Sequence, residues 1–316
     1  MLKIYKSNFD SLREMNLTEL EKGAWFNLIN PTAEEINSVA SVTGVPLDFL
    51  KAALDEEERS RVEIEENCLL IITNIPVMRG SDNYDALPLG IVLTTDYFIT
   101  VCLEQNEVLS EFSNDTARLF HTVKRTRLLF QVLYKSALLY LKYLKQINRR
   151  TDDIERHLRR SMKNKEMFQL LDLQKGLTYY TATLRSNGIV LEKLLRLGTN
   201  AQLQHLIKIY DEDQDLLEDV IIENKQAIEM VEMYSGILSG MMDAFASIIS
   251  NNLNRVMKFL ATMTILLAIP TMIASFWGMN VDVPFRDSAG GFMEVSLFAL
   301  AITGTSAFVL WKKDMF

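Results

Sequence analysis

A line of small and polar side chains repeats at intervals of three and four residues through the last third of the chain. Stepping back from Gly278, the line contains Ser275, Thr271, Ala268, Thr264, Ala261, Met257, Asn254, Ser250, Ser247 and Asp243. This spacing places the side chains on one face of a helix. Two interpretations stay open: close packing against another helix, or the wall of a water-filled path between several copies of the chain.

The lower part of this line favours the water-filled path. Four members of the line precede the uncharged part of the helix: Asn254, Ser250, Ser247 and Asp243. At these four positions, dry packing between helices would favour leucine. A single pair of helices cannot enclose a pore, so this interpretation requires a homo-oligomer with the first apolar helix innermost. The line ends in Gly278-Met279-Asn280, which by itself is only a helix end followed by a polar residue.

Acidic side chains form the second group that could do chemistry. The stretch "YDEDQDLLED", residues 210–219, holds six acids on a predicted helix. Like charges this close on a helix need cations or basic neighbours. A divalent-cation sensor is one solution, and pairing with the basic stretch 118–165 is the other.

Residues typical of enzymes are missing from the sequence pattern. We find no glycine-rich phosphate loop and no nucleophile elbow. His121, His157 and His205 have no metal-ligating partner three or four residues away. Cys68 and Cys102 lack the spacing of a zinc or redox motif, which predicts reduced core residues. We therefore expect that the protein is not an enzyme.

Two uncharged apolar runs are long enough to cross a bilayer. The runs are 259–277, with nineteen residues, and 295–311, with seventeen. Arg255 and Lys258 precede the first run, Lys312 and Lys313 follow the second, and the linker between the runs is acidic overall. The positive-inside bias therefore predicts a multi-pass protein of the cell membrane with both termini in the cytoplasm. The N-terminus has no signal-peptide core, so the first domain is expected in the cytosol.

The sequence before the first apolar run has two parts that differ in composition. Residues 1–112 contain short β-type runs, "AWFNLI", "CLLIITNIPV" and "LGIVLTTDYFITVCL", with a helical stretch after "NPT", which predicts an α/β domain. No proline occurs between Leu89 and Ile269, so long helices are expected at about 115–162, 166–196 and from 201 to the membrane. At 1.5 Å per residue the last would be roughly 115 Å long.

Charge argues against a nucleic-acid partner. The chain has 33 basic and 41 acidic residues, a formal net charge of −8. Only the stretch 118–165, with fourteen basic residues and three acids, runs against this balance. We interpret that stretch as a solvated helix face or one that packs against acidic helices, in preference to an RNA site.

These motifs together resemble the CorA family of magnesium channels. Gly278-Met279-Asn280 matches the family's motif, and "NRVMKFL", "PTMIASFWGMN", "TLRSN" (Thr183–Asn187) and "PTAEEI" are similar to its pattern along nearly the whole chain. The resemblance implies a homopentameric funnel in the membrane, with Mg²⁺ as transported and regulatory ion and with Co²⁺ or Ni²⁺ as further candidates. One departure is that no Glu follows Pro284 in the outer loop, where Asp282, Asp287 and Glu294 could attract cations instead.

The resemblance also implies roles for individual residues. Gly278, Met279 and Asn280 would form the selectivity filter, in which a ring of uncharged Asn280 carboxamides holds hydrated Mg²⁺. Asn254, Met257, Leu260 and Thr271 would face the pore, with Met257 and Leu260 as an apolar constriction that gates by dewetting, and Asp243 as an acidic ring. Lys258, Lys312 and Lys313 would form a basic collar. Asp219, with Asp82 or Asp85 of a neighbouring copy, is the candidate regulatory metal site.

The predicted fold is therefore α+β, in seven parts. These are a cytosolic α/β domain (1–112), an antiparallel helical pair (113–200), a stalk helix (201–258), a pore-lining transmembrane helix (259–277), an outer loop (278–294), a second transmembrane helix (295–311) and a basic tail (312–316). Two alternatives stay open: a zinc transporter of the same superfamily, which Met279 disfavours, and a membrane-anchored helical scaffold. The scaffold would tolerate Asn280→Ala, whereas a channel would not.

Overall fold

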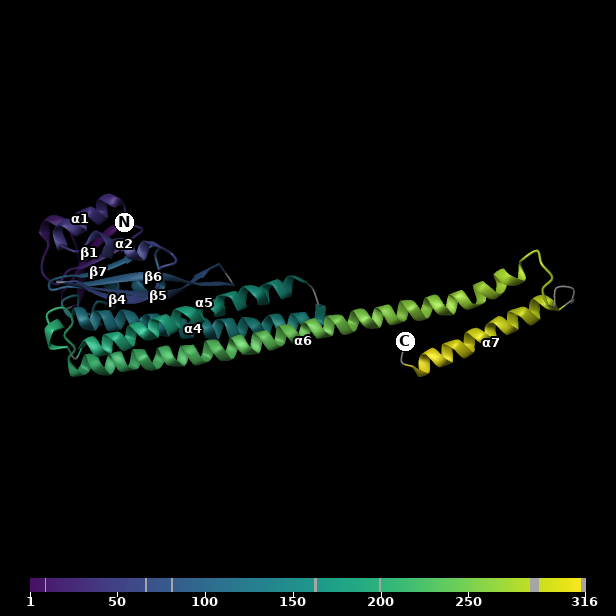
Figure 1. Cartoon of the computed structure of the whole chain (residues 1–316). Helices are drawn as coiled ribbons and strands as arrows, with labels where there is room; N and C mark the ends of the chain where they lie inside the picture. The colour runs from purple at the N-terminus through teal and green to yellow at the C-terminus, as the bar shows by residue number, and fades with distance from the viewer. Residues whose placement is uncertain are drawn as a thin grey trace. The chain divides into compact units, whose positions relative to one another are not determined.

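The computed structural model describes residues 1–8, 10–65, 67–80, 82–161, 164–198, 200–284 and 290–313 (Figure 1). The chain forms two compact units, Met1–Gly240 and Met241–Phe316. Helix α6 (Asp211–Trp277) contributes residues to both units. Each unit is described below by itself.

A sheet of seven strands forms the centre of the first unit. Its spatial order is β2-β1-β3-β7-β6-β5-β4, and every neighbouring pair is antiparallel except β3 and β7. The strands are β1 (Leu2–Asn8), β2 (Ser11–Met15), β3 (Trp25–Ile29), β4 (Arg61–Glu65), β5 (Cys68–Arg79), β6 (Asn83–Thr94) and β7 (Phe98–Cys102). The three β-type runs of the sequence correspond to β3, β5 and the β6–β7 pair, whereas β1, β2 and β4 were not predicted. Cys68 and Cys102 are buried free thiols, as expected.

Short helices cover one face of the sheet (Figure 1). They are α1 (Ala33–Thr43), α2 (Leu47–Lys51) and the 3₁₀ turn Ala52–Leu54, and Ile36, Val39 and Leu50 are buried with them. Thr32 begins α1 with a capping box: its hydroxyl accepts a hydrogen bond from the Glu35 amide at 3.2 Å, and the Glu35 carboxylate accepts one from the Thr32 amide at 2.8 Å. The "NPT" start predicted from the sequence is therefore confirmed.

Long helices cover the other face (Figure 1). Helix α4 (Arg125–Ser161) and α5 (Asn164–Gly198) pack on β5 and β6, and α6 lies beside them. The remaining short elements are the helix α3 (Glu107–Ser110) and the 3₁₀ turns Leu17–Glu19, Asn114–Thr116 and Ala201–Leu203, the last of which precedes α6. This layering places α6 on the outside of the helical layer.

Two long helices begin later than the sequence predicts. The chain before α4 is held on β1, because the Ser7 amide donates to the Thr122 hydroxyl at 3.1 Å and the Thr122 amide donates to the Ser7 hydroxyl at 2.9 Å. Helix α6 begins at Asp211, with three acids in its first turn, where the helix dipole favours negative charge. The segment before α6 is held by the Lys208 amide, which donates to the Thr126 hydroxyl at 3.3 Å.

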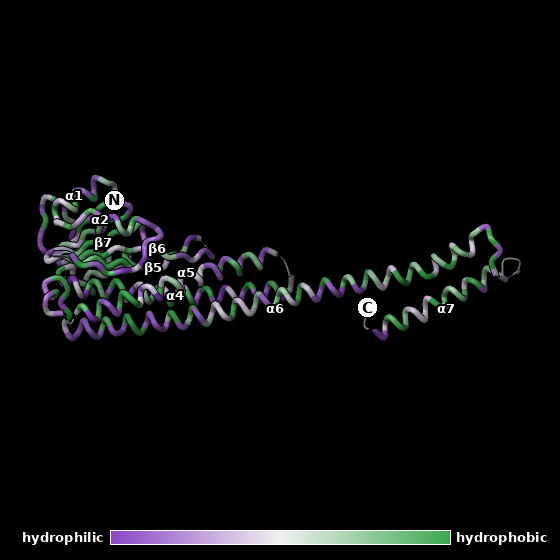
Figure 2. The backbone as a smooth tube through the Cα atoms, viewed as in Figure 1, coloured by the Kyte–Doolittle hydropathy of each residue, from purple (hydrophilic) through white to green (hydrophobic). Residues whose placement is uncertain are grey.

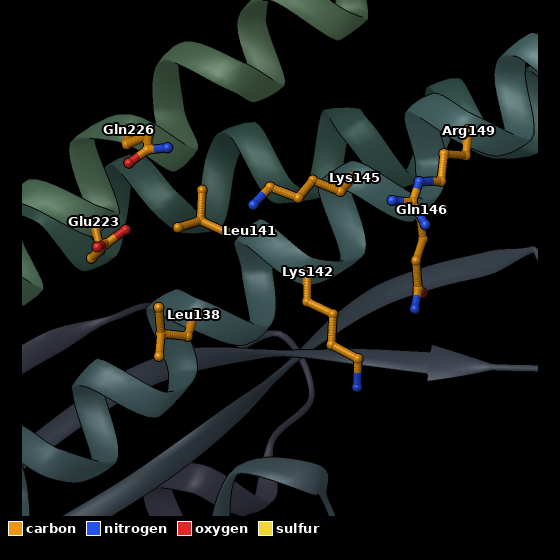
Figure 3. Close-up of a pocket in the computed structure, with 8 residues that line it drawn as sticks. All are labelled: Leu138, Leu141, Lys142, Lys145, Gln146, Arg149, Glu223 and Gln226. Atoms are coloured by element: carbon orange, nitrogen blue, oxygen red, sulfur yellow. The ribbon is translucent and has the colours of Figure 1, made fainter.

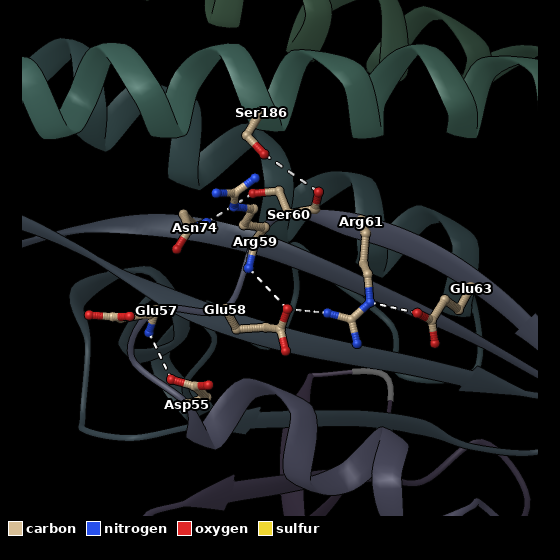
Figure 4. Close-up of polar contacts among 9 residues, drawn as sticks. All are labelled: Asp55, Glu57, Glu58, Arg59, Ser60, Arg61, Glu63, Asn74 and Ser186. Carbon is tan, nitrogen blue, oxygen red and sulfur yellow. Dashed lines mark hydrogen bonds and ion pairs between the residues drawn. The ribbon is translucent and has the colours of Figure 1, made fainter.

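A buried polar cluster joins the long helices to the sheet. The Asn187 side chain on α5 accepts hydrogen bonds from the Asn74 amide (2.9 Å) and the Ser60 hydroxyl (2.8 Å) and donates to the Asn74 carbonyl (2.7 Å). Figure 4 shows Asn74 donating in turn to Ser60. Tyr140 on α4 donates to the Asn74 carbonyl at 3.1 Å and contacts the Thr183 hydroxyl at 3.1 Å. Two residues of "TLRSN" thus fix α4 and α5 on β5.

The second unit consists of the last part of α6 and of α7 (Gly291–Lys312). Figure 2 shows that apolar residues dominate both segments. By length and composition both helices could cross a membrane. The spans predicted at 259–277 and 295–311 lie inside these two helices.

Candidate functional site

Helices α6 and α7 turn one face of each toward the other. Figure 1 draws α7 alongside the last part of α6. In this part of α6 the less exposed side chains recur every three or four residues, at Thr262, Leu266, Ile269, Ile273 and Trp277. The less exposed side chains of α7 follow the same spacing, at Val295, Ala299, Ile302, Ser306 and Leu310. This matched periodicity identifies the packed face of each helix.

The polar line lies on the side of α6 away from α7. At about 100° per residue, Thr264, Ala268, Thr271 and Ser275 point opposite to Thr262, Leu266, Ile269 and Ile273. All four members of the line are exposed in the single chain. Because α7 covers the other side, this face is the one that remains for other copies of the chain or for water.

The hydroxyl groups on this face are oriented by the helix itself. Thr264 donates to the Leu260 carbonyl at 2.8 Å, and Thr271 donates to the Leu267 carbonyl at 2.7 Å. Each hydroxyl hydrogen is therefore occupied, while the oxygen keeps a free lone pair. The exposed side of these groups is an acceptor surface, which suits a hydrated cation.

The outer turn ends α6 at Gly278-Met279-Asn280. The Gly278 amide still donates to the Ala274 carbonyl at 3.0 Å, and a Cβ at Gly278 would lie only 3.3 Å from that oxygen. Glycine is therefore favoured by this close approach, and its φ angle is not positive. Asn280 is exposed, and among the described residues its side chain makes no hydrogen bond. Trp277 anchors the following loop by donating to the Pro284 carbonyl at 3.3 Å.

Acidic residues flank this turn. Asp282 and Glu294 are both exposed, Glu294 in the first turn of α7. Asp287, the third acid named from the sequence, lies outside the described residues. The two described acids therefore carry their negative charge on the surface of the second unit.

The line continues below the apolar part of α6. Asp243, Ser247, Ser250 and Asn254 are exposed, and so are Met257 and Leu260, at 58% and 53%. Lys258 on α6, Lys312 at the end of α7 and Lys313 after it are exposed too. Within the described part of the chain, these three lysines make no ion pair, and neither does the Asp243 carboxylate.

The candidate regulatory acids have different surroundings. Asp82 binds the Arg150 guanidinium through two hydrogen bonds of 2.8 Å, and its side chain is 17% exposed. Asp85 contacts Arg79 at 3.5 Å and accepts from the Ala86 amide at 2.9 Å. Asp219 is exposed on α6. Nowhere in the described ranges do three or more His, Cys, Asp or Glu residues form a group able to hold a metal; the sequence-predicted site needs a second copy.

The basic stretch packs against acids, as one of the sequence interpretations expected. Arg127 pairs with Glu212 at 3.4 Å and with the buried Asp213 at 3.2 Å, which joins α4 to the acidic start of α6. Four more cations of the stretch pair with acids from other elements: Arg118 with Asp10, Lys135 with Glu111, Lys142 with Glu107, and Arg150 with Asp82. The pKa of Glu107 is lowered by the hydrogen bond from Tyr143 and by Lys142.

The family model of the CorA-like Mg²⁺ transporter protein matches residues 21–313. The chain belongs to this family. It is 26% identical over 283 residues to the cobalt/magnesium transport protein CorA of Methanocaldococcus jannaschii, covering 88% of this chain and 86% of the relative. It is 21% identical over 298 residues to the protein of the same description from Thermotoga maritima, covering 89% and 82%.

Several solved structures share the fold of this chain. The complete CorA magnesium transporter of M. jannaschii matches with a TM-score of 0.83 at 23% identity, over 98% of this chain and 96% of that one. The full-length CmaX protein matches with a TM-score of 0.73 at 15% identity, over 98% and 96%. The ZntB cytoplasmic domain of Vibrio parahaemolyticus matches with a TM-score of 0.61 at 12% identity, over 79% and 98%.

Membership of the CorA-like family agrees with the site geometry. The family consists of membrane transport proteins and not of enzymes. A polar helix face that the partner helix leaves open can line a water-filled path once several copies assemble. The buried cluster around Asn187 could not be predicted from the sequence, because the pairing of β4 with β5 is what brings Asn74 and Ser60 to that side chain.

Proposed function

We propose that this protein carries hydrated Mg²⁺ across the cell membrane through a pore lined by α6. Its family and its cobalt/magnesium transport relatives support divalent-cation transport. The observation that carries the proposal is the position of the polar line. It lies opposite the α7-covered face of α6 and ends at Asn280, which has no side-chain partner among the described residues. Co²⁺ is a second cargo, in line with the names of the relatives.

The pore needs several copies of the chain, and we propose a homopentamer. One exposed helix face cannot surround an ion, and cyclic symmetry places the same face of every copy around one axis. Both termini are cytoplasmic in this proposal, because Lys258, Lys312 and Lys313 then lie on the inner side as a basic collar. Asn280 then lies at the outer mouth.

Selectivity comes from the outer ring. Mg²⁺ gives up its water reluctantly, so a ring of neutral carboxamide oxygens that accepts hydrogen bonds from that water can select the ion by its hydrated size. Met279 packs behind the ring and keeps its diameter. Farther in, Met257 and Leu260 form the apolar constriction that closes by dewetting, and Asp243 forms an acidic ring below it.

Uptake of Mg²⁺ into liposomes that hold the purified oligomer tests this proposal. We expect dye-reported uptake by the wild type and its loss in Asn280→Ala. Asn251→Ala is the matched control, because Asn251 is also exposed but lies off the polar line. Absence of uptake by a folded wild-type oligomer would reject the channel and favour a helical scaffold. Uptake of Zn²⁺ alone would favour a zinc transporter.

A further inference from the structure

Two cavities of the first unit have linings of different kinds. Figure 3 shows the groove between α4 and α6, with a volume of about 540 Å³, in which three cations and one acid outnumber two leucines. A second cavity, of about 590 Å³, lies between the strands β1, β2 and β3 and the segment 105–114. It combines aromatic and aliphatic side chains with a few polar groups, which is the usual lining of a small-molecule site. The cavity on the sheet is therefore the better candidate for binding an organic ligand.

The floor of this cavity is the face of the sheet opposite α1 and α2. Side chains alternate between the two faces of a strand, and Phe26 belongs to the core that includes α1. Its neighbours Trp25 and Asn27 line the cavity on the other face. On β1, Lys3 is paired with Asn27, and Tyr5 is paired with Trp25. The sheet register thus places an ammonium group beside a carboxamide, and a phenol ring beside an indole.

The wall of the cavity is held in place by side chains of its own segment. Asn114 accepts a hydrogen bond from the Leu12 amide of β2 at 2.9 Å. Glu107 in α3 accepts a hydrogen bond from the Tyr143 hydroxyl of α4 at 2.7 Å. The segment 105–114 is therefore fixed both to the sheet and to a long helix, and the cavity is formed without a ligand. A preformed cavity lowers the entropic cost of binding.

Three polar groups that line the cavity lack a partner among the described residues. The Lys3 ammonium and the Glu14 carboxylate pair neither with each other nor with any other described residue. Asn27 is only 7% exposed, and its Oδ1 accepts a hydrogen bond from the Thr100 hydroxyl at 3.1 Å. Its Nδ2 donates no hydrogen bond to any described residue. A buried donor without an acceptor is destabilising, so an acceptor inside the cavity would be bound favourably.

We propose that this cavity binds a zwitterionic amino acid with a large apolar side chain. The carboxylate of the ligand accepts hydrogen bonds from Lys3 and from the Nδ2 of Asn27, and the ammonium of the ligand pairs with Glu14. The apolar side chain of the ligand lies against Tyr5 and Phe112, which also line the cavity. This inference goes beyond the proposed function and requires neither the pore nor the oligomer.

The charges of the cavity favour a dipolar ligand over a simple ion. An anion would satisfy Lys3 and Asn27 but would be repelled by Glu14, and a cation would be repelled by Lys3. Glu14 is paired with Tyr5 in the sheet, so it lies one cross-strand row away from Lys3 and Asn27. Adjacent rows on one face are separated by about 7 Å along the strands. A molecule with a carboxylate and an ammonium can therefore bind both rows at once.

Calorimetric titration of the purified full-length protein tests this site. L-phenylalanine and L-leucine should bind with one molecule per chain. Two compounds that lack one charged group, 3-phenylpropionate and 2-phenylethylamine, should each bind at least about tenfold more weakly than L-phenylalanine, because each leaves a charged group of the cavity unpaired. Equal affinity for these three aromatic compounds, or no binding of either amino acid by the folded protein, would overturn the proposal.

Substitution of the two charged side chains assigns them to the two ends of the ligand. In Glu14→Gln, L-phenylalanine and 3-phenylpropionate should bind with similar affinity, because the ammonium of the amino acid has lost its carboxylate. In Lys3→Met, L-phenylalanine should bind no better than 2-phenylethylamine. Lys51→Met is the matched control and should bind as the wild type does, because Lys51 is exposed on α2, at the other face of the sheet. Wild-type discrimination among the ligands in both Glu14→Gln and Lys3→Met would overturn the site, whatever the result for Mg²⁺ uptake.

Discussion

Two asparagines in this chain act in opposite ways. Asn187 is 6% exposed, and both ends of its carboxamide are bonded to Asn74. Asn280 is exposed, and the described residues offer its carboxamide no hydrogen bond. The carboxamide of Asn187 stabilises the fold because the partners it satisfies are buried. The carboxamide of Asn280 keeps its hydrogen-bonding capacity, which the proposed ring around a hydrated ion requires.

Asn187→Ala is therefore expected to destabilise the protein by about 3 kcal/mol, because the buried Asn74 amide loses its acceptor and the Asn74 carbonyl keeps only the Tyr140 hydroxyl as donor. Asn280→Ala should leave the stability unchanged. Thermal unfolding of the two variants in detergent, followed by tryptophan fluorescence, measures the difference. Ser186→Ala is the control, because the Ser186 hydroxyl makes only a 3.5 Å contact with the Ser60 carbonyl. Equal melting temperatures for Asn187→Ala and Ser186→Ala would contradict this role.

Glu35 gives a pH-dependent contribution. Hydrogen bonds from the Thr32 and Leu2 amides lower the pKa of its carboxyl below the ordinary value of 4.5. A lowered pKa in the folded state means that the stabilisation is present above about pH 4.5 and is lost as the pH falls through the folded pKa. We expect Glu35→Gln to melt below the wild type at pH 7 and the gap to shrink below pH 4.5. A gap that stays constant with pH would contradict the assignment.

At the scale of elements, α6 has two faces with different partners. One face packs on α7, and the other carries the polar line from Asp243 to Ser275. Small side chains on the polar face leave room along the axis of an oligomer, whereas exposed apolar residues of α7 can contact lipid.

Ala268→Phe should therefore reduce Mg²⁺ uptake strongly without lowering the yield of folded oligomer. A phenyl ring at this point of every copy would fill the pore. Ala301→Phe on α7 is the matched control, because Ala301 is exposed on an apolar helix and off the polar line. Liposome uptake assays on both variants compare the two sites. Equal loss of uptake in both would indicate that the polar line does not face the pore.

Much of α6 and α7 could be predicted from the sequence, because charge-free runs and the spacing of small residues are local signals. The edge strands β2 and β4 gave no such signal, since their exposed residues break the apolar runs. The start of α4 depends on the contact between Ser7 and Thr122, which are 115 residues apart. The pairing of Asp82 with Arg150 likewise depends on the tertiary fold. The sequence alone therefore gave no reason to prefer either Asp82 or Asp85 as the regulatory ligand.

At the scale of the whole molecule, the proposed regulatory site needs acids from two copies of the chain. Asp82 is already neutralised by Arg150 in its own chain. Asp85 has a longer contact with Arg79 and remains the more available of the two hairpin acids. We therefore propose Asp219 and Asp85 of neighbouring copies as the ligands of a weak Mg²⁺ sensor, completed by water.

Mg²⁺ uptake, measured at two Mg²⁺ concentrations inside the liposomes, separates the roles of these acids. In liposomes loaded with Mg²⁺ on the cytoplasmic side, the wild type should be inhibited, whereas Asp219→Asn and Asp85→Asn should each stay active, and the double variant should show no further change. Asp82→Asn should keep the inhibition but lower the melting temperature, because it leaves Arg150 without its carboxylate. Full inhibition of Asp219→Asn would remove this residue from the sensor. Because a shared ion couples the two carboxylates, equal effects of the single and double variants are the signature of one site between copies.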